Sequence, residues 1–154
     1  MIRVEKYDED RHFDRILEMQ LREADREELW ASTGLPQGEG LIRSVNKSDI
    51  VCYVYLNGKE IIALSGASYT ELSTFAIVWA LGTDDVLKYW DEVEPLFTSH
   101  VNGVLGTPGI ELIGNKIDMR NKAHIRWLQK LDFTFSGQYT ELGGHKFEIF
   151  YKGK

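Results

Sequence analysis

Two carboxylates beside one predicted strand are the side chains of this sequence best placed for acid–base chemistry. Segment 110–117 is rich in β-branched residues, and Glu111 and Asp118 lie on it and directly after it. A carboxylate there can take a proton from a bound substrate, directly or through water. Polar alternation along a half-exposed strand also accounts for both residues, and we favour this structural explanation over a catalytic one. Asn115 and Lys116 carry the same ambiguity.

The histidines, the cysteine and the serines indicate no second site. The histidines are His12, His100, His124 and His145. Their spacing is not that of paired metal ligands, so we expect no bound metal. His124 opens a predicted helix, where a capping or solvated role is favoured over that of a base. Cys52 lies in mid-strand, where a thiol is buried and inert, and no Gly-x-Ser-x-Gly pattern of a serine hydrolase occurs.

Composition is that of an ordinary globular protein and argues against two classes of partner. The 154 residues are 43% apolar and 27% charged, with a net charge of −6. Lysines and arginines are scattered, so we expect no nucleic acid as partner. The longest apolar run, 75–81, is far shorter than the roughly 20 residues that cross a bilayer. The charged first residues lack a signal-peptide core, so we expect a cytoplasmic protein without membrane attachment.

Periodicity places these residues in an alternating order of strands and helices. Asn57-Gly58 predicts a tight hairpin turn with two positive φ angles, Leu29 and Trp30 form the buried edge of one helix, and Pro95 should kink or split another. The expected helices are 23–32, 39–46, 122–131, one from Asp10 onward, and one from Asp85 to about Val101. The expected strands are 2–7, 50–56, 60–66, 74–81, 110–117, 133–139 and 146–151.

This order predicts an α/β (α+β) fold with a mixed central sheet, in a single domain spanning 1–154. The unit 74–117 reads as a strand, a helix and a second strand, which should form a right-handed crossover between parallel strands. Hairpins before and after this unit add antiparallel strands.

One segment carries a family resemblance. Residues 118–133 resemble the fifth-strand and fourth-helix motif of the GNAT acyl-CoA N-acyltransferase superfamily. The positions that match in register are Asn121, Ile125, Lys130, Leu131 and Phe133. The element order is also similar to that of GNAT proteins over nearly the whole chain, so the resemblance implies a GNAT fold.

The resemblance also implies where acetyl-CoA would bind. The end of the strand 74–81 would hydrogen-bond the pantetheine arm, and Asn121 would contact the cofactor. The strand-end residues are Trp79, Ala80, Leu81, Gly82 and Thr83. Glu111 or Asp118 would then serve as the base.

Two departures from the family pattern argue against catalysis. GNAT enzymes hold the cofactor diphosphate on the bare amides of a glycine-rich loop, whereas this sequence has Asp84 and Asp85 there. Two like charges near contact cost roughly 1 kcal/mol in water, comparable to the attraction of a helix terminus for an anion. Leu128 occupies the position of the tyrosine that commonly protonates the leaving thiolate, and Asp132 replaces the glycine of the motif.

A narrower resemblance leads to two hypotheses. Segments 21–28, 31–35, 79–84 and 125–128 are similar to small tailed-phage proteins encoded among virion-assembly genes. The first hypothesis is a phage-encoded GNAT-fold protein with a degenerate acetyl-CoA site, acting in the virion or host cytoplasm as an assembly or interaction module for a protein partner. The second is an acyl-CoA-dependent N-acetyltransferase acting on an amine of a protein or small molecule. The departures favour the first, and the oligomeric state stays open.

Overall fold

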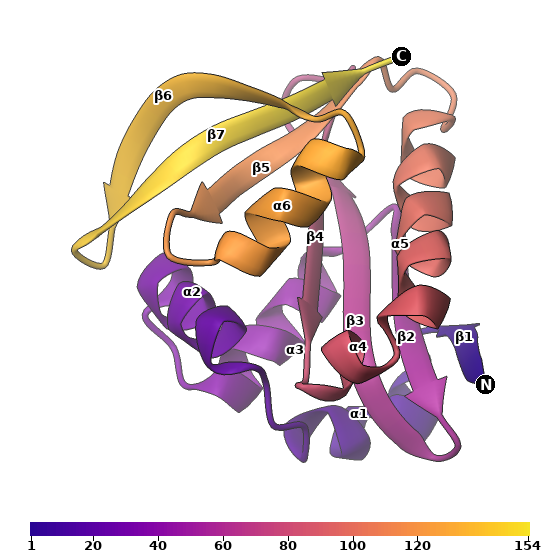
Figure 1. Cartoon of the computed structure of the whole chain (residues 1–154). Coiled ribbons are helices and arrows are strands. Elements are labelled where there is room, and N and C mark those ends of the chain that lie inside the picture. Colours follow the sequence, from indigo (N-terminus) through magenta and orange to yellow (C-terminus); the bar gives the residue numbers. More distant parts are fainter.

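The computed structural model describes residues 1–154 as a seven-stranded mixed sheet with helices on both faces (Figure 1). The strand order is β1-β2-β3-β4-β5-β7-β6, and only the β4–β5 pair is parallel. The strands are β1 (Ile2–Lys6), β2 (Val51–Asn57), β3 (Glu60–Tyr69), β4 (Phe75–Gly82), β5 (Leu112–Asp118), β6 (Thr134–Leu142) and β7 (His145–Gly153). The helices are α1 (Glu9–Leu17), α2 (Glu23–Thr33), α3 (Gln37–Lys47), α4 (Asp85–Lys88), α5 (Trp90–Leu105) and α6 (Lys122–Lys130). The predicted mixed α/β fold is confirmed.

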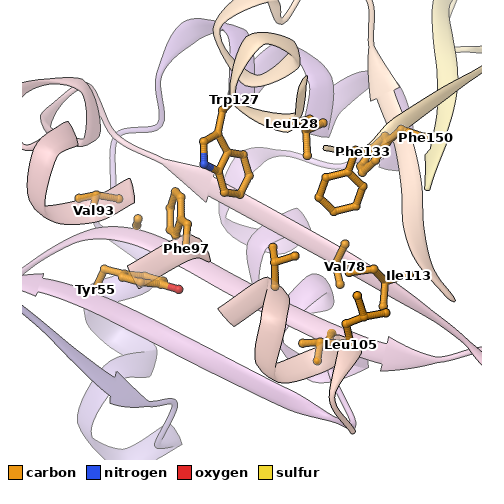
Figure 2. Packing of buried hydrophobic residues seen from close by; sticks show 14 of the residues in the cluster. Tyr55, Val78, Val93, Phe97, Leu105, Ile113, Trp127, Leu128, Phe133 and Phe150 are labelled. Carbon is orange, nitrogen blue, oxygen red and sulfur yellow. The ribbon is translucent and has the colours of Figure 1, made fainter. Parts of the chain in front are cut away.

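Two hydrophobic cores hold the helices to the sheet. The larger core lies between the sheet and α4, α5 and α6; in it, Trp127 of α6 packs against Phe97 of α5 with ring centroids 5.2 Å apart (Figure 2). The smaller core lies between the sheet and α1, α2 and α3 and contains Ile16, Leu41 and Cys52. Strand β3 is buried over most of its length because helices cover both of its faces. No helix is long and apolar enough to span a membrane.

Local signals fix several helix ends. The Asp8 carboxylate accepts a hydrogen bond from the Arg11 amide at 3.2 Å and caps α1. Gly34 ends α2 with a φ of 69°, a left-handed conformation that glycine adopts readily. After α6 the same left-handed conformation is taken by Asp132, with a φ of 63°, and the Phe133 amide turns back to the Leu128 carbonyl. Asp132 therefore performs the conformational role of the glycine in the family motif.

The predicted hairpin turn differs in register. The turn residues are Gly58 and Lys59, and only Gly58 has a positive φ, at 63°. Asn57 is still paired with Glu60 in the ladder. A β-bulge near Tyr55 takes up one residue and shifts the pairing, which the dipeptide pattern alone does not reveal.

The structure corrects the expected split of a helix at Pro95 and the expected burial of Trp30. The helix breaks at Tyr89, and α5 continues through Pro95. Pro95 is the sixth residue of α5, so its missing N–H removes one hydrogen bond of the helix without ending it. Trp30 is 60% exposed, because the buried side of α2 is formed by Asp25 and Leu29, four residues apart.

Candidate active site

Strands β4 and β5 are paired only at one end and then diverge. Their parallel ladder covers Phe75–Ile77 against 112–114. Beyond it, the Asn115 side-chain amide donates to the Val78 carbonyl at 2.9 Å and bridges the closed end of the gap. Figure 1 shows the two strands separating from there, with α6 in front and α2 behind. We call this gap the opening.

The far end of the opening is bridged by a buried carboxylate from α2. Asp25, 3% exposed, accepts hydrogen bonds from the Gly82 amide at 2.9 Å and from the Asn121 side-chain amide at 2.8 Å. The Arg22 guanidinium pairs with the same carboxylate at 2.9 Å, which compensates its burial. Asp25 thus joins the end of β4 to the start of α6.

The free edge of β4 is partly occupied by the protein's own backbone. The Arg22 amide donates to the Gly82 carbonyl at 2.9 Å, and Leu21 forms an antiparallel bridge with Thr83. Val78 and Gly82 both present backbone groups to the opening. The backbone N–H and C=O groups of successive residues point to opposite edges of a strand. Those of Ala80, midway between Val78 and Gly82, therefore face the opening too.

Two cavities meet at the opening. The first, which we call the splay cavity, measures about 310 Å³ and passes between β4 and β5 from α2 and α3 to the core beneath α6. The second, the helix cavity, measures about 180 Å³ and lies between the end of β4 and helices α4, α5 and α6. His124 and Trp127 line both. The helix cavity is also lined by the cations Arg22, Arg126 and Lys130.

Glu28 is the one acidic side chain that lines the splay cavity. Its carboxylate accepts a hydrogen bond from the Asp118 amide at 3.0 Å. Burial, reinforced by the charges of Asp25 and Asp118, raises the pKa of Glu28 to about 8, although hydrogen bonds oppose the shift. Burial lowers the pKa of His124, which favours its neutral imidazole. A carboxyl group with such a pKa beside a cavity is suited to proton transfer near neutral pH.

The opening also holds two buried polar atoms without a partner. They are the side-chain carbonyl oxygen of Asn121 and the indole N–H of Trp127. Buried polar groups in proteins are nearly always paired, so an unpaired acceptor and an unpaired donor beside a cavity indicate a place where a polar ligand binds.

The residues predicted to bind a cofactor mostly lie here. Trp79, Ala80 and Leu81 line the splay cavity, and Ala80, Leu81 and Gly82 line the helix cavity. The Trp79 indole itself donates to the Ser48 hydroxyl at 2.8 Å, on the α3 side.

Thr83, Asp84 and Asp85 line neither the splay cavity nor the helix cavity. The Thr83 amide and hydroxyl both donate to the Ile62 carbonyl. Thr83, Asp84 and Asp85 line a separate hollow together with Arg15 and other residues of the α1 end and the β2–β3 turn, not the helix cavity. Asp84 and Asp85 stand at the start of α4, as expected, but they line this hollow and not the helix cavity.

Neither of the two predicted catalytic carboxylates, Glu111 and Asp118, is placed to act as a base. Glu111 is exposed before the start of β5 and lines neither cavity. Asp118 is buried, and both of its oxygens accept hydrogen bonds from the Arg120 guanidinium, the shortest at 2.7 Å. Burial would raise the pKa of Asp118, but these bonds outweigh it and hold the pKa below its usual value. Asp118 contributes its backbone amide to Glu28.

Sequence reasoning missed Asp25 and Glu28. Both belong to the acidic run 23–28, a pattern that is typical of a solvated helix face. The available signal was Leu29: residues three or four apart share a helix face, so Asp25 had to lie on the side that Leu29 buries.

The sequence matches no family model and no curated protein. The fold, however, matches solved acetyltransferases over nearly the whole chain. One is a GNAT-family acetyltransferase from Streptococcus pneumoniae, at TM-score 0.66 and 12% identity over 99% of both chains. Another is the aminoglycoside acetyltransferase AAC(6')-Ib in complex with coenzyme A, at TM-score 0.73 and 14% identity over 100% of this chain and 95% of that one.

A third is RimL, a ribosomal L7/L12 α-N-protein acetyltransferase in complex with coenzyme A, at TM-score 0.68 and 14% identity over 99% of this chain and 93% of that one. The chain therefore has the GNAT acetyltransferase fold, as its element order and the segment 118–133 implied.

Proposed function

We propose that this protein is an acyl-coenzyme A-dependent N-acyltransferase that binds an amine in the splay cavity and uses Glu28 as its base. The observation that carries the proposal is a carboxyl group with a pKa of about 8 on the wall of a cavity that passes between the diverging strands β4 and β5. The coenzyme A complexes of proteins with this fold support the choice of acyl donor.

The residues around the opening fit an acyl-coenzyme A. The Ala80 backbone, the Asn121 carbonyl oxygen and the Trp127 indole N–H are suited to the amides of a pantetheine arm. Arg126 and Lys130 are suited to its phosphates, and the carboxylates of Asp84 and Asp85 lie outside the helix cavity. The backbone of Gly82 is already engaged, by Asp25 and Arg22.

When bound, the thioester supplies the acyl group: an N–C bond to the acceptor forms, the C–S bond breaks, and the proton that the amine loses is returned to the released sulfur. Glu28 accepts that proton at its carboxylate, which the Asp118 amide holds in place. Leu128 cannot donate a proton to the released sulfur. His124 of α6 lines both cavities, and its neutral imidazole can relay the proton from Glu28 to the sulfur by accepting at one ring nitrogen and donating from the other. The apolar lining around Trp127 and Phe133 limits water near the acyl group.

Calorimetric titration with acetyl-coenzyme A tests this proposal, and micromolar binding is expected. Glu28→Gln should keep that affinity while transfer to an amine falls by about 10²-fold, the usual contribution of a general base. Glu27→Gln is the matched control, because Glu27 is half-exposed, pairs with Arg120 at 3.4 Å and lines neither cavity. No heat at millimolar cofactor would refute the enzyme.

A non-catalytic assembly or interaction module of a phage virion is the second candidate. It is favoured by Asp25, which spans the opening and accepts hydrogen bonds from the Gly82 backbone amide and the Asn121 side-chain amide, two donors that an extended ligand would otherwise pair with. Leu128 in place of a proton donor points the same way. This candidate predicts no binding of acetyl-coenzyme A, so the same titration separates the two.

A further inference from the structure

The charged side chains of the splay cavity are arranged as one acid facing two bases. Besides Glu28, the charged residues on its wall are Lys47, at the end of α3, and Lys116, on β5. Neither lysine ammonium forms an ion pair or a hydrogen bond within the protein, and both side chains are exposed at the rim. In a chain with a net charge of −6, this wall is locally cationic.

Strand geometry places Lys116 and the Glu28 carboxylate along the same stretch of β5. Side chains two residues apart share a face of a strand, so Lys116 and Asp118 point to the same side, about 7 Å apart along β5. Glu28 is bonded to the Asp118 amide, which places its carboxylate near the end of this stretch. That distance of about 7 Å is the rise between the two Cα atoms, and the flexible four-carbon stem of Lys116 lets its ammonium lie several ångströms nearer to or farther from the Glu28 carboxylate.

Glu28 and Lys116 can therefore hold an amine and an anion of the same small molecule. The nitrogen and a carboxylate oxygen of an α-amino acid are about 3 Å apart. A hydrogen bond of about 2.8 Å at each end gives a span of about 8–9 Å between the two protein groups. The bond at Lys116 is charge-assisted, and the bond at Glu28 becomes so once this carboxyl group has lost its proton.

The remaining wall favours an apolar body over a sugar or a polyamine. Ile77, Trp79, Leu142 and Phe147 supply apolar surface. The nearby hydroxyls are directed to their own helix backbone: those of Ser32 and Thr33 to the Leu29 carbonyl, and that of Ser44 to the Gly40 carbonyl. The cavity therefore offers few free hydroxyl donors, and a polycation would meet two lysines.

We infer that the acceptor is an α-amino acid with an apolar side chain, its amine at Glu28 and its carboxylate at Lys116, with Lys47 nearby. Acylation of this amino acid rests on the proposed function. Binding of the amino acid does not, because Glu28 and the two lysines hold it without acyl-coenzyme A.

The test is calorimetry without coenzyme, using L-phenylalanine, its decarboxylated analogue phenethylamine, and spermidine. Phenylalanine should bind at least 10-fold more tightly than either amine. Lys116→Met should remove that advantage, whereas Lys59→Met, at the β2–β3 turn and outside the splay cavity, should preserve it. Acetylation of phenylalanine with acetyl-coenzyme A is measured in parallel.

The outcomes separate the two claims. Phenethylamine or spermidine binding as tightly as phenylalanine overturns the inference, as does the absence of binding by all three. Phenylalanine binding that depends on Lys116, without binding of acetyl-coenzyme A, sustains the ligand and refutes the enzyme. Acetylation of spermidine in preference to phenylalanine sustains the enzyme and refutes the ligand.

Discussion

At the scale of single residues, Glu28 couples the site to the stability of the fold. Its pKa rises from 4.5 to about 8, so between these values the folded state keeps a proton that the unfolded state has lost. The stability contributed by neutral Glu28 is therefore complete below about pH 4.5, and is lost as the pH rises through 8.

Glu28→Gln should abolish this loss, because glutamine stays neutral. We expect the melting temperature of the variant, relative to the wild type, to rise by several degrees as the pH increases from about 5 to about 8 and to change little above that. Thermal unfolding followed by circular dichroism across this range measures the difference. The control Glu27→Gln should show no such trend; a flat difference for Glu28→Gln would mean that its pKa is not raised.

Asp132 gives a second prediction at this scale. It adopts a φ of 63° at the end of α6, and it is exposed. Only glycine takes that conformation without steric cost. Asp132→Gly should stabilise the protein by about 0.5–1 kcal/mol in urea unfolding, whereas Asp132→Ala should not, because alanine keeps the strain. Equal effects of the two substitutions would contradict this account.

At the scale of secondary-structure elements, Asp25 is the connection that holds α2, β4 and α6 together. Its carboxylate serves three donors: the Gly82 amide, the Asn121 side chain and the Arg22 guanidinium. Asp25→Ala would leave all three without an acceptor in a buried site.

Breaking a buried ion pair in this way costs about 3–5 kcal/mol, a large part of the stability of a small domain. We expect Asp25→Ala to lose at least about 3 kcal/mol by denaturant unfolding. Asp84→Ala is the matched control, since Asp84 is exposed and its side chain forms no hydrogen bond or ion pair. A loss below about 1 kcal/mol for Asp25→Ala would show that the bridge between these elements is unimportant.

At the scale of the whole molecule, local patterns predicted the elements and tertiary contacts decided the site. Strand β4, the hairpin strands and α6 follow from apolar periodicity and from the motif around Asn121. The side on which Asp84 and Asp85 lie depends on the four-residue helix α4 and its break at Tyr89, for which the sequence carries no signal. Likewise, Asp25 and Glu28 are identical in type to their solvated neighbours, and only the packing of α2 across the opening distinguishes them.

The single cysteine is buried in β2 behind α1–α3, so its rate of alkylation reports how often the protein unfolds. Cys52 is 9% exposed, and burial raises the pKa of its thiol to about 12. Reagents attack the thiolate, so alkylation requires the sheet to come apart. Modification of native protein should be at least about 10³-fold slower than that of an unfolded thiol, given a stability of 5 kcal/mol or more. Mass spectrometry of the alkylated fraction would then rank every variant above without any denaturant.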